Sequence, residues 1–172
     1  LSSTSAVYGD APVPTDESCK LNPISPYATT KIIGEEYCKL YSQVYKLDTC
    51  ILRYFNVYGN RMNDTGGYKL VFPIFKEQIK EGKPCTINNN GKQSRDYVHV
   101  DDVVEANILA AKYEYQFSGD IFNVGSGTNI SINHLVDLMG GKKGHGNTVI
   151  EPFETLAQTQ KIYNKLGWTA KV

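Results

Sequence analysis

The sequence predicts an α/β fold, because segments with helical periodicity alternate with short segments typical of buried strands. Three segments carry most of this prediction. Apolar residues recur at helical spacing over 25–46, and the runs at 49–54 and 120–124 fit strands. The 172 residues suffice for a domain with a substantial core, and no internal repeat or low-complexity segment interrupts the alternation.

Composition limits the partners that can be expected. Basic and acidic residues are equal in number, 18 of each, so the formal net charge gives no reason to expect nucleic acid. No apolar run is long enough to cross a bilayer, so no membrane partner is expected. The four cysteines lack C-x-x-C spacing, which is typical of reduced thiols, and the expected location is the cytoplasm.

The first elements follow from proline and capping signals. Residues 1–24 are expected to hold a strand end and then a loop, because three prolines prevent a helix there. Ser25 and Pro26 form a typical helix start, with Ser as the cap and Pro at the first helical position. The helical spacing that follows continues to about Lys46, and residues 49–54 then predict a buried strand.

The rest of the chain continues the alternation, with stop signals such as Glu81-Gly82-Lys83-Pro84 between elements. The expected elements are a loop over 60–67, a helix over 71–80, a strand at 86–87, a turn at 88–91, a strand over 95–100, a helix capped by Asp101 or Asp102 and running to 113, a strand over 120–124, a turn at 125–127, a helix from Ser131 to 139, a Gly/Lys loop over 140–146 and a helix over 159–166.

One pair of side chains suggests chemistry. Tyr27 and Lys31 are four residues apart on a predicted helix, so they project from the same face. A nearby ammonium favours the phenolate form of a tyrosine. Such a pair can accept a hydroxyl proton while a hydride leaves the same carbon. Spacing alone is a weak signal, since most such pairs are ordinary helix-surface residues.

Five further segments, in a fixed order, strengthen that interpretation. They lie at 2–9 (SSTSAVYG), 52–59 (LRYFNVYG), 95–102 (RDYVHVDD), 122–127 (FNVGSG) and 166–168 (LGW). Together with Tyr27 and Lys31, they resemble in order and spacing the extended short-chain dehydrogenase/reductase family of NAD-dependent sugar epimerases and dehydratases. The resemblance covers nearly the whole chain.

The resemblance implies an architecture. We expect the C-terminal part of a Rossmann-type doubly wound parallel sheet plus a small mixed α/β substrate-binding lobe. Residues 1–59 and 101–127 would form the remaining part of the Rossmann-type domain, and residues 60–100 and 128–172 the lobe. The chain opens without Met on what resembles the end of a strand, so a fragment is expected.

The resemblance also implies roles in catalysis and in binding NAD. Tyr27 matches the base, Lys31 the residue that binds the nicotinamide ribose, and Thr4 the hydroxyl that binds the sugar 4-hydroxyl and can relay its proton. The alternative for Thr4 is a strand-end hydroxyl that caps its own backbone. The residues implied to contact NAD are Ser2, Ser3, Tyr27, Lys31, Tyr54 and Val57.

A second group is implied to bind a nucleotide sugar, with a UDP-linked sugar expected. Asn56 matches the amide that holds the glycosyl phosphate. Arg95 matches the arginine that faces the diphosphate, a role that suits its planar fork of donors; the alternative is a surface ion pair with Asp96. The backbone of Leu70, Val71 and Phe72 is implied to approach the nucleotide, with plain helix-face packing as the alternative.

The positions after Thr4 discriminate between reactions of this family. Its dehydratases and decarboxylases place an acid one or two residues after that hydroxyl, where this chain has Ser5 and Ala6. The interpretation is therefore a 4-epimerase acting on UDP-glucose or UDP-N-acetylglucosamine by transient oxidation at C4. The alternatives are a 4,6-dehydratase or reductase of the same family, or a non-catalytic nucleotide-sugar-binding or dimerising fragment.

Departures from the family pattern matter as well. The G-x-x-G-x-x-G phosphate turn is not in this sequence, and the 125–127 turn is interpreted as a plain strand-to-helix turn. The family's late Arg-x-Gly-Asp-like stretch is matched only by 150–154 (IEPFE), without arginine. The small Thr155 hints at tolerance for an N-acetyl group.

Two remaining patterns concern metals and assembly. His99, His134 and His145 are scattered without partners at metal-ligand spacing, so no metal is expected. A stripe of tyrosines follows Lys31 on the same helix, and the family commonly dimerises through this helix. We therefore expect a homodimer through the Tyr27–Lys31 helix, with the stripe made of Tyr37, Tyr41 and Tyr45.

Overall fold

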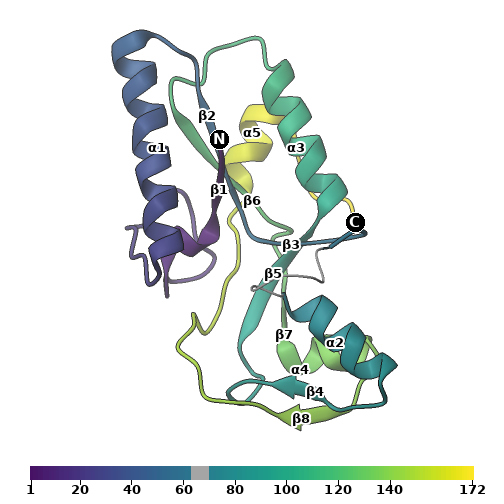
Figure 1. The fold of residues 1–172 in the computed structure, drawn as a ribbon. Helices are drawn as coiled ribbons and strands as arrows, with labels where there is room; N and C mark the ends of the chain where they lie inside the picture. Colours follow the sequence, from purple (N-terminus) through teal and green to yellow (C-terminus); the bar gives the residue numbers. More distant parts are fainter. Residues whose placement is uncertain (63–69) are drawn as a thin grey trace.

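A computed structural model describes residues 1–62 and 70–172 and confirms the α/β class. Three parallel strands form a sheet in the order β1-β2-β6, where β1 is Ser2–Thr4, β2 is Cys50–Tyr54 and β6 is Asp120–Val124 (Figure 1). Their carboxyl ends therefore lie at one edge of the sheet, as expected for a doubly wound arrangement.

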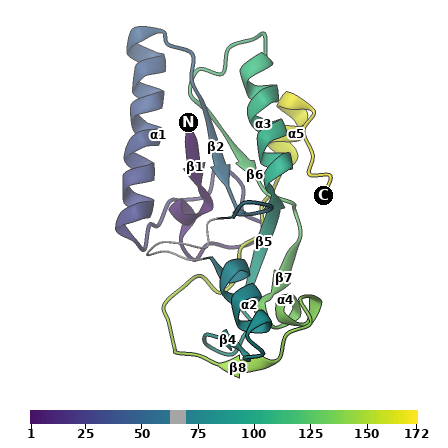
Figure 2. The same ribbon diagram turned by 45° about the vertical axis from the view of Figure 1, so that its right-hand side comes forward.

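Three helices pack on this sheet (Figure 2). Helix α1, Pro26–Tyr45, runs along β1 and also contacts β2, whereas α3, Val100–Lys112, and α5, Gln160–Leu166, pack together near β2 and β6. The predicted start of α1 is confirmed: the Ser25 hydroxyl accepts a hydrogen bond from the Ala28 amide at 3.1 Å. This cap fixes where α1 begins, and hence where its first turn meets the sheet.

A smaller lobe lies beyond the carboxyl edge of the sheet (Figure 1). The lobe has its own apolar cluster, to which α2, α4 and β4 contribute Phe75, Cys85, Ile87, Leu135 and Val136. Its elements are β3 (Asn56–Tyr58), α2 (Val71–Lys80), β4 (Cys85–Ile87), β5 (Ser94–His99), β7 (Asn129–Ser131), α4 (Ile132–Leu138) and β8 (Lys143–His145).

The expected loop over 140–146 is wrong in its middle, where β8 forms. Strand β8 pairs in parallel with β4, with Cys85 opposite Lys143 and Ile87 opposite His145. Its residues have no strand pattern of their own, so the strand exists because β4 supplies partners for its backbone. The expected loop over 60–67 lies outside the described residues from 63 onward.

The expected cap of α3 is also wrong. His99, and not Asp101 or Asp102, occupies the cap position, and its Nδ1 accepts a hydrogen bond from the Asp101 amide at 3.3 Å. Asp102 is buried and accepts instead from the backbone amides of Lys171 and Val172, at 3.0 and 3.2 Å. The carboxylate expected to begin a helix thus holds the last residues of the chain.

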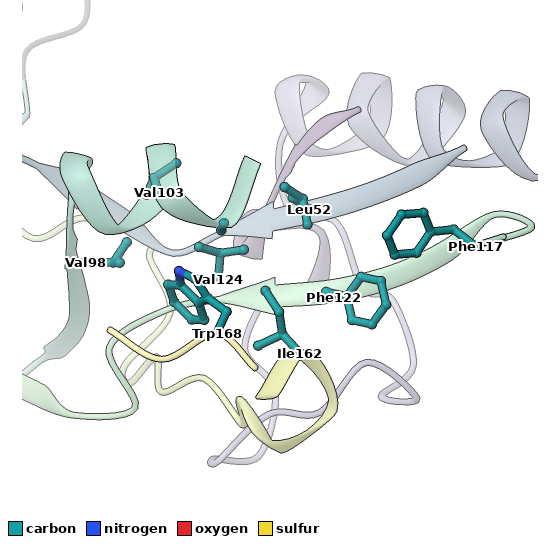
Figure 3. Packing of buried hydrophobic residues seen from close by; sticks show 9 residues of the cluster. Leu52, Val98, Val103, Phe117, Phe122, Val124, Ile162 and Trp168 are labelled. Atoms are coloured by element: carbon teal, nitrogen blue, oxygen red, sulfur yellow. The ribbon is translucent and has the colours of Figure 1, made fainter. Parts of the chain in front are cut away.

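The sheet's core includes residues from the end of the chain (Figure 3). Ile162 and Trp168 are fully buried with Leu52 and Phe122, and the Trp168 indole donates to the Asp102 carbonyl at 2.9 Å. The assignment of all of 128–172 to the lobe is therefore wrong for 160–172, because this segment buries its apolar side chains against the sheet. The rest of the two-part division stays a prediction.

Candidate functional site

The predicted catalytic residues lie at the carboxyl edge of the sheet. Strand β1 ends at Thr4 and continues directly into a short 3-10 helix, Ser5–Tyr8, which packs against α1. Tyr27 and Lys31 lie in the first two turns of α1, at the end of the helix nearest this edge (Figure 1). In open α/β sheets, ligands bind at this edge of the strands.

Tyr27 and Lys31 lie close together. The Lys31 ammonium is 5.7 Å from the centre of the Tyr27 ring, and it donates a hydrogen bond to the Ser2 carbonyl at 2.9 Å. The Tyr27 side chain is accessible, since the residue is 55% exposed. The helix face predicted from spacing therefore places a phenol and an ammonium together beside β1.

Thr4 has a partner that fits its alternative interpretation. Its Oγ1 accepts a hydrogen bond from the Ala6 amide at 3.2 Å and so caps the short helix that follows. A hydroxyl that accepts from a backbone amide still has its own O–H to donate. The capping contact and the predicted contact with a sugar hydroxyl are therefore compatible.

The two residues before Thr4, Ser2 and Ser3, point to opposite faces of β1. Ser2 Oγ lies 3.1 Å from the Tyr54 hydroxyl, which donates to Asn107 Oδ1 at 3.0 Å. Ser3 points to the opposite face, as alternation along a strand requires, and donates to the buried carboxylate of Glu35. The side chain of Ser3 is thus committed within the protein, which leaves its backbone for the predicted contact with NAD.

A buried ion pair supports the site and was missed by the sequence analysis. The Arg53 guanidinium donates to both oxygens of Glu35, at 2.9 and 2.6 Å, and the two residues are 1% and 0% exposed. Glu35 lies one turn after Lys31 on α1, and Arg53 lies on β2. The signals that could have found the pair are a charged residue inside an apolar strand and a glutamate at helical spacing from Lys31.

The ion pair extends into a polar network across the sheet. Arg53 Nη1 donates to the Tyr8 hydroxyl at 2.9 Å, and that hydroxyl donates to Asn123 Oδ1 at 2.6 Å. Burial raises the pKa of Tyr8 to about 12, although the Arg53 charge acts in the opposite direction. The network therefore joins α1, β1, β2, β6 and the short helix after Thr4 into one unit.

Two predicted contact residues lie on β3, the first strand of the lobe after β2. Asn56 is predicted to bind the substrate and Val57 to contact NAD, and Asn56 pairs with Tyr97 of β5. Phe72 stacks on Tyr58 with ring centres 5.3 Å apart and meets the edge of Tyr97 at 5.1 Å.

The start of α2 contacts the apolar cluster of the lobe. Leu70 precedes the helix, and Val71 and Phe72 pack against the apolar cluster of the lobe. The side chains of Val71 and Phe72 therefore pack on the helix face, as in the alternative interpretation. The predicted approach of their backbone to a nucleotide remains a prediction.

Arg95 does not pair with Asp96. Its Nη2 donates to Glu151 Oε2 at 2.5 Å, whereas Asp96 points to the other face of β5. Asp96 accepts from the amides of Ser126, Gly127 and Ala157 at 2.7, 3.1 and 3.0 Å. Burial raises the pKa of the Asp96 carboxyl, while these hydrogen bonds act to lower it. Asp96 therefore holds the 125–127 turn and leaves Arg95 to Glu151.

The described residues contain neither a metal-binding cluster nor a membrane-spanning helix. Within 1–62 and 70–172, no group of three or more His, Cys, Asp or Glu side chains is arranged to hold a metal ion. Over the same ranges, no helix combines the length and the apolar character needed to cross a membrane.

Comparison with known proteins places this geometry. Residues 1–125 match the model of the NAD dependent epimerase/dehydratase family. The UDP-glucose 4-epimerase of Mycolicibacterium smegmatis is 40% identical over 144 residues, which cover 83% of this chain and 45% of that protein.

Solved structures share the fold. A UDP-N-acetylglucosamine 4-epimerase from Methanobrevibacter ruminantium M1 in complex with UDP-N-acetylmuramic acid has a TM-score of 0.88 at 33% identity, over 99% of this chain and 56% of that one. A UDP-glucuronic acid 4-epimerase from Bacillus cereus in complex with UDP-glucuronic acid and NAD has a TM-score of 0.89 at 31% identity, over 99% and 55%.

The parallel sheet, its flanking helices and these structural matches define a Rossmann-type α/β protein. The chain belongs to the NAD-dependent epimerase/dehydratase family. It spans about half the length of the curated relatives it matches.

Proposed function

We propose that the whole protein containing this chain catalyses the NAD-dependent 4-epimerisation of a UDP-sugar by transient oxidation at C4. The observation that carries this proposal is the Tyr27–Lys31 pair, which contacts β1, the strand that ends at Thr4, at the carboxyl edge of the sheet. The similar proteins named above act on or bind UDP-sugars, which supports this substrate class.

The residues of this edge fit NAD. The Lys31 ammonium has three N–H donors, and within the described residues one of them goes to the Ser2 carbonyl, so donors remain for ribose hydroxyls. Tyr54 and Val57 are proposed to line the nicotinamide side of the NAD site. The backbone of Ser2 and Ser3 is proposed to contact NAD as well. Bound NAD supplies a reversible hydride acceptor for the sugar carbon.

The chain's own residues would then move the proton. Tyr27 accepts the 4-hydroxyl proton, directly or through Thr4, as the C4–H bond gives up its hydride. It returns the proton after the 4-keto sugar has turned over and the hydride has come back to the opposite face. Ser5 and Ala6 carry no acid for the loss of water, so dehydration is less well supported than epimerisation.

The lobe is proposed to hold the nucleotide end of the substrate. Asn56 would bind the glycosyl phosphate and Arg95 the diphosphate, while the backbone of 70–72 approaches the nucleotide. These residues come from segments at the junction between sheet and lobe, so a substrate bound there would reach from the lobe to Tyr27.

Assembly through α1 is also proposed. The tyrosine stripe Tyr37, Tyr41 and Tyr45 is exposed along this helix, which supports a homodimer that covers it. Sedimentation of the whole protein should give a dimer, and a monomer at micromolar concentration would contradict this proposal.

The function is tested by supplying the whole protein with NAD and either UDP-glucose or UDP-N-acetylglucosamine. We expect the 4-epimer of each substrate, resolved by chromatography, with the N-acetyl sugar accepted because Thr155 is small. A 4-keto-6-deoxy product would favour the dehydratase, and failure of both sugars to change would favour a binding or dimerising role. Turnover of UDP-glucose alone would contradict the expectation for Thr155.

A further inference from the structure

The proposed function leaves one contact unexplained, the ion pair between Arg95 and the carboxylate of Glu151. Arg95 is 8% exposed, so its guanidinium is nearly removed from water, and Glu151 Oε2 lies 2.5 Å from its Nη2. Within residues 1–62 and 70–172, Nη1 of the same guanidinium donates to the Ser94 and Phe153 carbonyls, at 2.8 and 3.4 Å. Arg95, the residue proposed to bind the diphosphate, is therefore already paired with a carboxylate in this structure.

Other donors converge on the same carboxylate. Gln93 Nε2 and Asn89 Nδ2 donate to Glu151 Oε1 at 3.2 and 3.1 Å. Gln93 is 4% exposed, and its Oε1 is buried without a hydrogen-bond partner within the described ranges. One guanidinium and two amides around two oxygens form a site built for an anion, and the unpaired oxygen of Gln93 leaves an acceptor for a donor group of a ligand.

The backbone that carries Glu151 is fixed. Asn88 Oδ1 accepts from the Asn147 amide at 3.1 Å, and Asn89 Oδ1 accepts from the Val149 amide at 3.0 Å. The segment before Glu151 is thus hydrogen-bonded to the 88–91 turn, and this positions Glu151 beside Arg95. The Glu151 side chain is 31% exposed, so the carboxylate can rotate into water when another anion replaces it as the partner of the buried Arg95 and Gln93.

We propose that Glu151 lowers the affinity of this site for a phosphate-bearing ligand, because it competes with the ligand's phosphate groups for Arg95. Carboxylate and phosphate oxygens are bound by the same guanidinium geometry, and two anions on one nearly buried guanidinium repel each other, so a phosphate that binds Arg95 competes with Glu151. With Glu151 in place, the pair has no net charge, and a phosphate must displace a charge-assisted hydrogen bond in order to bind. This inference rests on the proposed function, because that function supplies the phosphate-bearing ligand.

The variant that tests the competition is Glu151→Gln. Gln removes the negative charge and keeps one oxygen, which can accept either from the Asn89 and Gln93 amides or from Arg95 but cannot replace both carboxylate oxygens, so Arg95 is held less strongly. The matched control is Glu154→Gln, which removes the same charge three residues away, where the carboxylate binds Asn129 and not Arg95.

The measurement is calorimetric titration of the whole protein with UDP. We expect Glu151→Gln to bind UDP about tenfold more tightly than the unmodified protein, a change of about 1.4 kcal/mol, and Glu154→Gln to bind it unchanged. If the unmodified protein binds UDP and Glu151→Gln binds it equally or more weakly, Glu151 is a structural partner of Arg95 and this inference is overturned. If none of the three proteins binds UDP, the proposed function fails and this inference fails with it.

Discussion

Replacing Tyr27 by Phe is expected to lower kcat for epimerisation by about 10²–10⁴-fold, the range that one general acid–base group contributes. The KM for the UDP-sugar should change little, because the ring stays in place and only the hydroxyl is removed. The residue is 55% exposed at the start of α1, so its hydroxyl can be deleted without opening a cavity in the core. Initial rates with both sugars measure the effect.

The control for this variant is Tyr37→Phe. Tyr37 lies on the same helix and is exposed to a similar extent, but it is about three turns further along the helix than Tyr27. We expect it to keep the activity of the unmodified protein. Equal activity of Tyr27→Phe and Tyr37→Phe would remove Tyr27 from the proposed chemistry.

Replacing Glu35 by Gln is expected to destabilise the fold by about 3–5 kcal/mol, because it leaves the buried Arg53 charge without a carboxylate. The Arg53 and Glu35 side chains are 2% and 0% exposed, so water cannot compensate for the lost partner. The free energy of unfolding in urea measures the loss. The matched control is Glu36→Gln, whose carboxylate forms a surface pair with Lys39 that contributes about 0–1 kcal/mol.

A double variant separates stability from positioning. Replacing both Glu35 and Arg53 by Met removes both buried charges and should recover most of the lost stability. We expect its kcat to be lower than that of the unmodified protein, because Glu35 no longer holds Ser3 and α1 together beside Lys31, and a shift of about 1 Å can cost about 10²-fold in rate. If stability and kcat recover together, the ion pair serves the fold alone.

The local signals in the sequence were sufficient for much of the fold. The beginning of α1 was predicted correctly because a Ser cap followed by Pro acts within four residues. The strands β2 and β6 were predicted because their residues are apolar enough to be buried. The pairing of Tyr27 with Lys31 was predicted because helical geometry alone places residues four apart on one face.

The parts that were missed depend on contacts between distant segments. Strand β8 exists because β4 pairs with it, and its own three residues are not strand-like. Trp168 was assigned to the lobe because position along the chain does not show that it packs on the sheet. The partners of Arg53 and Arg95 are separated from them by 18 and 56 residues, which no local pattern spans.

The most direct test of transient oxidation at C4 uses a UDP-sugar that carries deuterium at C4. The whole protein is incubated with NAD and this substrate in ordinary water, and the product is examined by proton NMR. The proposed function predicts that the 4-epimer retains deuterium at C4, since the hydride leaves and returns without exchanging with solvent. A 4-epimer that has lost its deuterium to water would contradict oxidation and re-reduction at that carbon.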